Sequence, residues 1–151
     1  MRSFIILLCA LSTLLACSAA PPEPAALDVR NELCAFCRMP VSDPSLAAQL
    51  VAPGEEPRFF DDIGCLRDYL SRTPQPPKAV CFVADHRTHA WVRRDTAVYV
   101  RSDIATPMWS HLTAYADGAS AAADPAARGG SLLRAQQVFG PGSGPSAREA
   151  R

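Results

Sequence analysis

The spacing of hydrophobic and polar positions in the first half of the chain predicts two strands, a helix and a further strand. Hydrophobic residues between positions 63 and 70 recur at the spacing of one helix face. Asp61 or Asp62 can cap the start of this helix, and the proline-rich residues 74–77 end it. The strands of this half are predicted at 46–51 and 58–60, on either side of a Pro53-Gly54 turn, and at 79–84.

The second half of the chain repeats this order of elements. Asp117 can cap an alanine-rich helix that runs to Arg128, and Gly129-Gly130 closes it. Each half therefore follows the order β-β-α-β, which indicates an α+β fold with a partly antiparallel sheet. The strands of the second half are predicted at 96–101, 111–116 and 132–138.

The 151 residues suit one small domain, flanked by two segments of different composition. The two small halves of the domain are expected at about 31–88 and 89–139. Residues 17–30 are rich in proline and alanine, which is typical of a stiff, extended linker. Residues 140–151 lack large apolar side chains, so a disordered tail is predicted there.

The first residues of the chain have the composition of an export signal. A short basic start is followed by an apolar run over residues 4–16, which is shorter than the roughly 20 residues of a spanning helix. The sequence Leu14-Leu15-Ala16-Cys17 resembles the lipobox of bacterial lipoproteins, in which the signal is removed and the cysteine is acylated. Cleavage near Ala19-Ala20 is the alternative. We expect a signal peptide at 1–16 and a lipid anchor on Cys17, with the domain facing the periplasm.

The charge balance argues against nucleic acid as a partner. The chain carries 15 basic and 15 acidic side chains, so it has no basic surplus that would attract phosphates. We therefore expect no nucleic-acid binding.

The segment Cys34-Ala35-Phe36-Cys37-Arg38-Met39 places two thiols and a thioether within six residues. These soft, polarisable donors favour Cu(I) over hard divalent ions. A structural disulfide between the two cysteines is an alternative, and so is half of a zinc site. The zinc interpretation needs two further ligands, for which the available side chains are Cys65, Cys81, His86 and His89. A thioredoxin-like motif is disfavoured because no strand immediately precedes the pair.

Met108 is a further candidate soft donor, since Pro107 presents it on a constrained loop between two predicted strands. Packing on Trp109 is the alternative role. Cys65, His86 and His111 form a second tier of candidate ligands. For Cys65 a buried position in the first helix is the competing interpretation, and for the two histidines it is a solvated loop.

Taken in order, these features resemble the NosL family of copper-binding lipoproteins accessory to nitrous oxide reductase. The resemblance rests on the lipobox, the C-x-x-C-x-M segment and the 106–108 Thr-Pro-Met step. It also rests on the segment 43–49, the stretches FFDDIGCL and VADHRTHAWV, and the late Gly-Gly pair. Family members commonly have glycine where this chain has Arg38 and Trp109.

This resemblance implies a fold, a ligand set and partners. The fold would be two β-β-α-β halves, similar also to the organomercury lyase domain. The implied cargo is Cu(I), held by donors drawn from Cys34, Cys37, Met39 and Met108. The implied client is nitrous oxide reductase during assembly of its copper cluster, with membrane-bound maturation factors such as an ABC transporter as further partners.

These observations lead to the hypothesis of a non-enzymatic copper carrier in the cell envelope. One alternative is an organomercury lyase-like thiol enzyme that uses Cys34 or Cys37 with an acidic partner such as Asp61. The other is a structural lipoprotein stabilised by zinc or by a Cys34–Cys37 disulfide.

Overall fold

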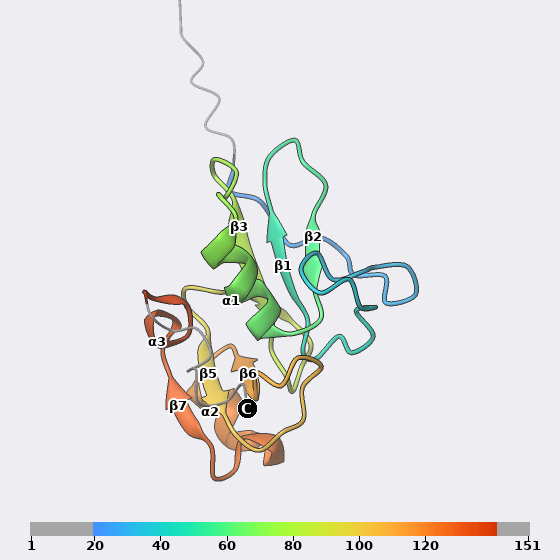
Figure 1. Cartoon of the computed structure of the whole chain (residues 1–151). Coiled ribbons are helices and arrows are strands. Elements are labelled where there is room, and N and C mark those ends of the chain that lie inside the picture. Colours follow the sequence, from blue (N-terminus) through green and yellow to red (C-terminus); the bar gives the residue numbers. More distant parts are fainter. Residues whose placement is uncertain (1–19, 142–151) are drawn as a thin grey trace, which may run out of the picture.

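The computed structural model describes residues 20–141 (Figure 1). The predicted signal peptide, the proposed lipid anchor on Cys17 and residues 142–151 of the predicted tail lie outside this range. Among the described helices, none has both the length and the apolar character needed to cross a bilayer.

The first sheet has four strands, in the order β2-β1-β3-β4, and all neighbouring pairs are antiparallel. The three strands predicted from the pattern are confirmed. The fourth strand was not predicted, because it is only three residues long and half exposed, and it follows the boundary expected near residue 88. The strands are β1 (Ala48–Val51), β2 (Arg58–Phe60), β3 (Val80–Ala84) and β4 (Trp91–Arg93).

The second sheet has three antiparallel strands in the order β6-β5-β7. They are β5 (Val98–Arg101), β6 (Leu112–Tyr115) and β7 (Ser131–Leu133). The prediction of a strand over 132–138 is wrong after Leu133, because the short helix α3 (Ala135–Phe139) follows. Ala135 and Val138 bury one side of this helix, and the Gln137 side chain accepts a hydrogen bond from the Arg134 amide at its start.

The other helices begin at the aspartates that the sequence indicated. Asp62, rather than Asp61, caps α1 (Ile63–Arg72) by accepting from the Gly64 amide. Asp117 caps α2 (Gly118–Ala123) in the same way. The helix expected to continue to Arg128 is interrupted at Asp124, because Pro125 has no amide hydrogen to donate, and a 3₁₀ turn η1 (Pro125–Ala127) follows.

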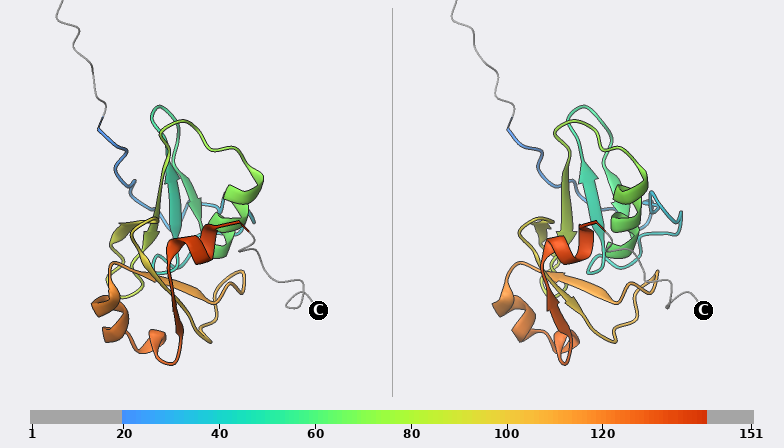
Figure 2. Two further views of the ribbon diagram at one scale, coloured as in Figure 1. Left: turned by 90° about the vertical axis from the view of Figure 1, so that its left-hand side faces the viewer. Right: turned by 60° about the vertical axis from the view of Figure 1, so that its left-hand side comes forward.

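Helix α1 joins the two halves into one packed unit. It lies against β1 and β2 of the first sheet and also contacts β6 of the second (Figures 1 and 2). One cluster of buried residues accordingly draws members from both sheets and from α1. Its largest members are Phe59, Phe60, Ile63, Leu66, Leu50, Tyr99 and Leu112. The β-β-α-β halves therefore share a core, and the fold is α+β with two antiparallel sheets.

The sheets meet at a buried carboxylate. Asp85 forms an isolated parallel bridge with Ala114, and its side chain accepts hydrogen bonds from the amides of Arg87, Thr88 and Ala116 and from the Ser120 hydroxyl. Burial alone would raise the pKa of Asp85. The bonds from Ala116, Ser120 and Thr88 outweigh that effect and lower the pKa to about 2. The ionised side chain therefore stabilises the junction.

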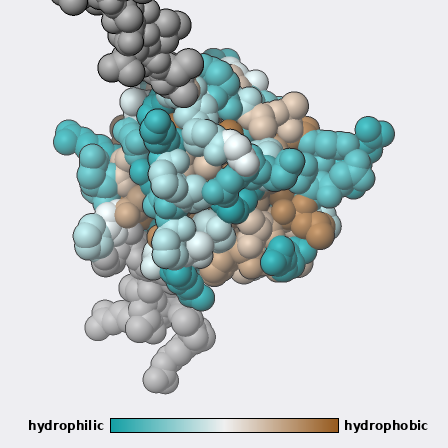
Figure 3. Space-filling model, turned by 90° about the horizontal axis from the view of Figure 1, so that it is seen from above, coloured by the Kyte–Doolittle hydropathy of each residue, from teal (hydrophilic) through white to brown (hydrophobic). Residues whose placement is uncertain are grey.

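The linker is tied to the first sheet before the domain proper begins. The buried Gln49 side chain accepts from the Ala25 amide at 2.8 Å and donates to the Ala25 carbonyl at 3.1 Å. Ala25 and Leu27 also pack against the core. From Ala25 onward the segment predicted to be a stiff, extended linker therefore runs along the domain. On the surface seen from above, apolar residues gather toward one side among hydrophilic ones (Figure 3).

The Asp85 carboxylate predicts a specific acid sensitivity. Its pKa is below the ordinary value of 3.8, so its stabilisation is complete above pH 4 and is lost as the pH falls from about 4 to about 2. At neutral pH we expect Asp85→Asn to lower the free energy of unfolding by about 2 kcal/mol, and to weaken its dependence on pH in that window. Urea denaturation across a pH series measures both effects. Asp103→Asn, at an exposed position, is the matched control and should change neither.

Candidate metal centre

The C-x-x-C segment forms a tight loop attached to the first sheet. The Cys34 amide donates to the Met39 carbonyl at 2.8 Å, and the Arg38 amide donates to the Cys34 carbonyl at 3.0 Å. The Ala35 amide donates to the Phe59 carbonyl on β2 at 2.8 Å. Inside the loop the Cys37 amide points at the Cys34 sulfur, 3.5 Å away. These bonds turn both thiols toward the junction of β2 and α1.

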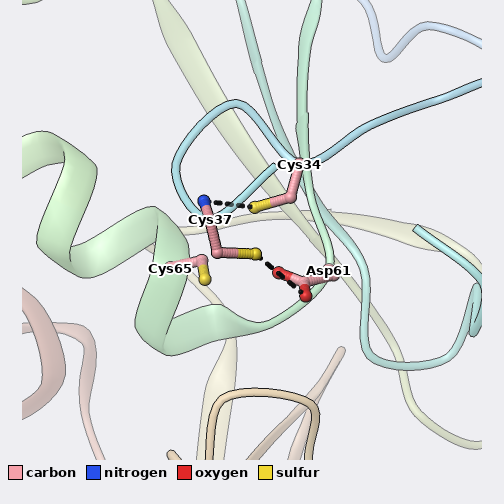
Figure 4. A group of neighbouring side chains, drawn as sticks. All are labelled: Cys34, Cys37, Asp61 and Cys65. Atoms are coloured by element: carbon pink, nitrogen blue, oxygen red, sulfur yellow. Dashed lines mark hydrogen bonds between the residues drawn. The ribbon is translucent and has the colours of Figure 1, made fainter. Parts of the chain in front are cut away.

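Two further side chains complete a group of four at this junction (Figure 4). Asp61 follows β2 directly, and Cys65 lies in the first turn of α1. Ligand atoms of Cys34, Cys37, Asp61 and Cys65 all lie within 4.8 Å of one another. Cys37 is half-buried and the other three are buried. The arrangement offers three sulfurs and a carboxylate to one ion.

The sequence had indicated Asp61 only as a possible cap or as the acid of a thiol enzyme, and not as a ligand. A signal for its role was nevertheless present, because two adjacent aspartates begin α1 and only one of them can cap it. Since Asp62 takes the cap, the Asp61 side chain is free to face the thiols. Cys65, placed in the second tier, lies both in the core and within the group.

The three thiols of this group differ in pKa. The Cys65 thiol hydrogen-bonds to Cys34, which lowers the pKa of Cys34 to about 6 and raises that of Cys65. Burial raises the pKa of Cys37 to about 11. The Cys37 thiol donates to Asp61 Oδ2 at 3.3 Å. Of the three cysteines in the group, Cys34 therefore has the lowest thiol pKa.

The two predicted thioether donors are exposed, and the backbone of each is hydrogen-bonded to a residue of this junction. The Met39 residue is 53% exposed and Met108 is 44% exposed. Met39 ends the C-x-x-C loop, and the Met108 amide donates to Asp62 Oδ2 at 3.0 Å, which holds its loop at the start of α1. Gly64 permits this approach, because a Cβ there would lie 2.8 Å from Ser110 Cβ. The backbone thus brings both methionine segments to the junction, and the ligand set of Cys34, Cys37, Met39 and Met108 stays a prediction.

The histidines of the second tier have other partners. His86 Nδ1 lies 2.7 Å from Asp124 Oδ2, and His111 Nδ1 lies 2.8 Å from the Ile104 carbonyl oxygen. Neither histidine belongs to the four-residue group. Cys81, one of the side chains available for the zinc interpretation, is buried in β3 and does not belong to the group. The four cysteines of the described chain are all free thiols.

The fold and this group define a class: a small α+β domain with a thiol-rich candidate metal centre at a strand–helix junction. The comparison with family models then gives the family. The NosL model matches residues 24–140, a range that contains all of the strands and helices described above, so the chain belongs to the NosL family. Membership indicates a copper-binding accessory protein. No curated protein matches the sequence significantly.

Two loop residues beside the centre have backbone conformations that favour glycine. Arg38 has φ of 68° and Trp109 has φ of 57°, both in the left-handed region. These are the two positions at which the family resemblance implies glycine. This chain therefore accepts local backbone strain in both loops that flank the centre.

Relieving that strain should stabilise the metal-free protein. We expect Arg38→Gly to raise the free energy of unfolding by about 0.5–1 kcal/mol, because removing the left-handed penalty exceeds the entropy that glycine adds to the unfolded chain. Urea denaturation measures the change. Arg93→Gly, at an exposed position of β4, is the control. It should lower the free energy of unfolding by a similar amount. A loss of stability in Arg38→Gly would contradict the strain argument.

Proposed function

We propose that this protein binds Cu(I) at the junction of β2 and α1 and delivers it to a client copper enzyme. The observation that carries the proposal is the convergence of Cys34 and Cys37 within one hydrogen-bonded loop, with methionines on that loop and on the neighbouring one. Thiolates and thioethers are the donors that favour Cu(I). Membership of the NosL family supports copper as the cargo.

The gradient of exposure across the donors suits a carrier better than a storage site. Cys34 is fully buried, Cys37 is half-buried, and the two methionines are exposed. A partner can therefore approach the ion from the methionine side and replace the outer ligands one at a time, while Cys34 still holds it. A closed cage of four buried thiolates would lack such an approach.

The proposed setting is the periplasmic face of a bacterial membrane. Acylation of Cys17 would hold the domain there and raise its effective concentration near membrane-bound partners. We propose nitrous oxide reductase as the client, during copper-cluster assembly, with an ABC transporter among the maturation factors. In this role the protein performs no catalysis.

Replacing the half-buried or exposed donors should weaken copper binding and leave the fold intact. We expect Cys37→Ser and Met39→Leu each to lower Cu(I) affinity at least about tenfold, since each removes a soft donor without opening a cavity in the core. Anaerobic competition with a Cu(I) chelator measures the affinity, and circular dichroism checks the fold. Leu132→Ala alters an exposed apolar residue away from the centre and serves as the control. Unchanged affinity in both donor variants would remove these residues from the site.

One contact favours a second candidate function, a thiol enzyme that cleaves carbon–mercury bonds. The Cys37 sulfur lies 3.3 Å from Asp61 Oδ2, so a thiol that can hold mercury is adjacent to an acid that can protonate a carbon leaving group. If the protein is a carrier, the reduced chain should release no benzene from a phenylmercury compound beyond the amount released by Asp61→Asn. Benzene formed over many turnovers by the wild type alone would instead establish the enzyme.

A further inference from the structure

A cavity lies in the second half of the domain, between the loop that follows β5 and the loop that precedes β7. Its volume is about 410 Å³, which is within the range of small-molecule sites. It is lined by residues 101–104 on the first loop and by Ala126, Arg128 and Gly129 on the second. The second loop lies at the end of the domain opposite the first described residues of the linker (Figures 1 and 2).

The Gly129-Gly130 pair brings the two loops together. Arg101 lies opposite Ser131 in the ladder between β5 and β7, and Arg128 precedes Ser131 by three residues. Gly129 has φ of 73°, in the left-handed region that glycine adopts readily. A Cβ at Gly130 would lie 2.8 Å from the Arg101 carbonyl oxygen, so only glycine permits this approach. The pair that was expected to close a helix therefore also places Arg128 at the same cavity as Arg101.

The lining of this cavity offers unpaired donors. Within the described residues, the guanidinium groups of Arg101 and Arg128 form no hydrogen bond and no ion pair. The Ser102 hydroxyl oxygen accepts from the Ile104 amide at 3.5 Å, which leaves the hydroxyl hydrogen available for donation. Asp103 also lines the cavity, so the lining carries two positive charges and one negative charge. Guanidinium groups bind carboxylate and phosphate oxygens with matched geometry.

We propose that this cavity binds a small organic oxyanion, either a phosphomonoester or a carboxylate. Its charged group lies between Arg101 and Arg128, where it offsets their mutual repulsion, and its organic part contacts Ile104 and Ala126. The ligand is a soluble compound, because the cavity lies away from the linker and hence from a membrane that would hold Cys17. This site shares no residue with the candidate metal centre and does not depend on the proposed copper carriage.

Titration of the reduced full-length chain followed by NMR tests the site. Glycerol 3-phosphate and succinate serve as the two oxyanion probes, and glycerol is the uncharged control. We expect glycerol 3-phosphate to shift the amide signals of Ser102 and Gly129 in a saturable way, and succinate to compete with it. Glycerol should produce no shift. The apparent affinity should fall as the salt concentration rises, because the guanidinium groups are exposed.

Variants separate this cavity from general attraction of anions to the surface. We expect Arg101→Gln and Arg128→Gln each to lower the affinity for glycerol 3-phosphate about fivefold or more, since each removes one charged donor. Arg93→Gln is the matched control, because it removes an exposed arginine outside the cavity, and it should leave the affinity unchanged.

Three outcomes would overturn the inference. The first is the absence of saturable shifts with both oxyanions. The second is an equal loss of affinity in Arg93→Gln and in the two cavity variants, which would show attraction by net charge alone. The third is binding of the wild type to phosphatidylglycerol vesicles, lost in Arg101→Gln, without binding of free glycerol 3-phosphate. That result would assign the cavity to a lipid headgroup instead of a soluble anion.

Discussion

The Asp62 carboxylate holds together the parts that the candidate metal centre needs. One of its oxygens caps α1 through the Gly64 amide, and the other accepts the Met108 amide from the loop before β6. These two bonds fix the start of the helix that carries Cys65 and bring in a loop from the second half of the chain. They also leave the neighbouring Asp61 to face the thiols. Without this carboxylate, the helix start and the Met108 loop would each need another partner.

The chemistry of the centre follows from how deeply each donor lies. Cys34, Cys65 and Asp61 are buried, Cys37 is half-buried, and the methionines are exposed. Sulfur donors therefore extend from the core to the surface, and the only carboxylate of the group lies inside. The hard donor is therefore confined to the buried part of the centre, whereas sulfur donors lie at every depth.

Much of this architecture was predictable from the sequence, because it depends on local patterns. The first helix, the strands near it and the C-x-x-C loop follow from hydrophobic spacing, capping aspartates and cysteine spacing. The strand β4 and the helix α3 did not follow, since β4 has no buried residue and α3 buries only two, so that tertiary packing decides them. Asp61 and Cys65 became part of the centre only through the packing of α1 against the loop. Local spacing cannot show that kind of convergence between separate segments.

The two hydrogen bonds between Gln49 and Ala25 limit how far the domain can lie from residues that precede Ala25 in the chain. If Cys17 carries the proposed acyl chains, the chain between it and Ala25 is eight peptide units long. At roughly 3.5 Å for each peptide unit, this connecting segment spans no more than about 28 Å. The remainder of the proline- and alanine-rich segment adds nothing to it. With that anchor, an acceptor for the proposed copper cargo would have to come close to the bilayer, and the contacts of Ala25, rather than the full length of the linker, would limit the distance.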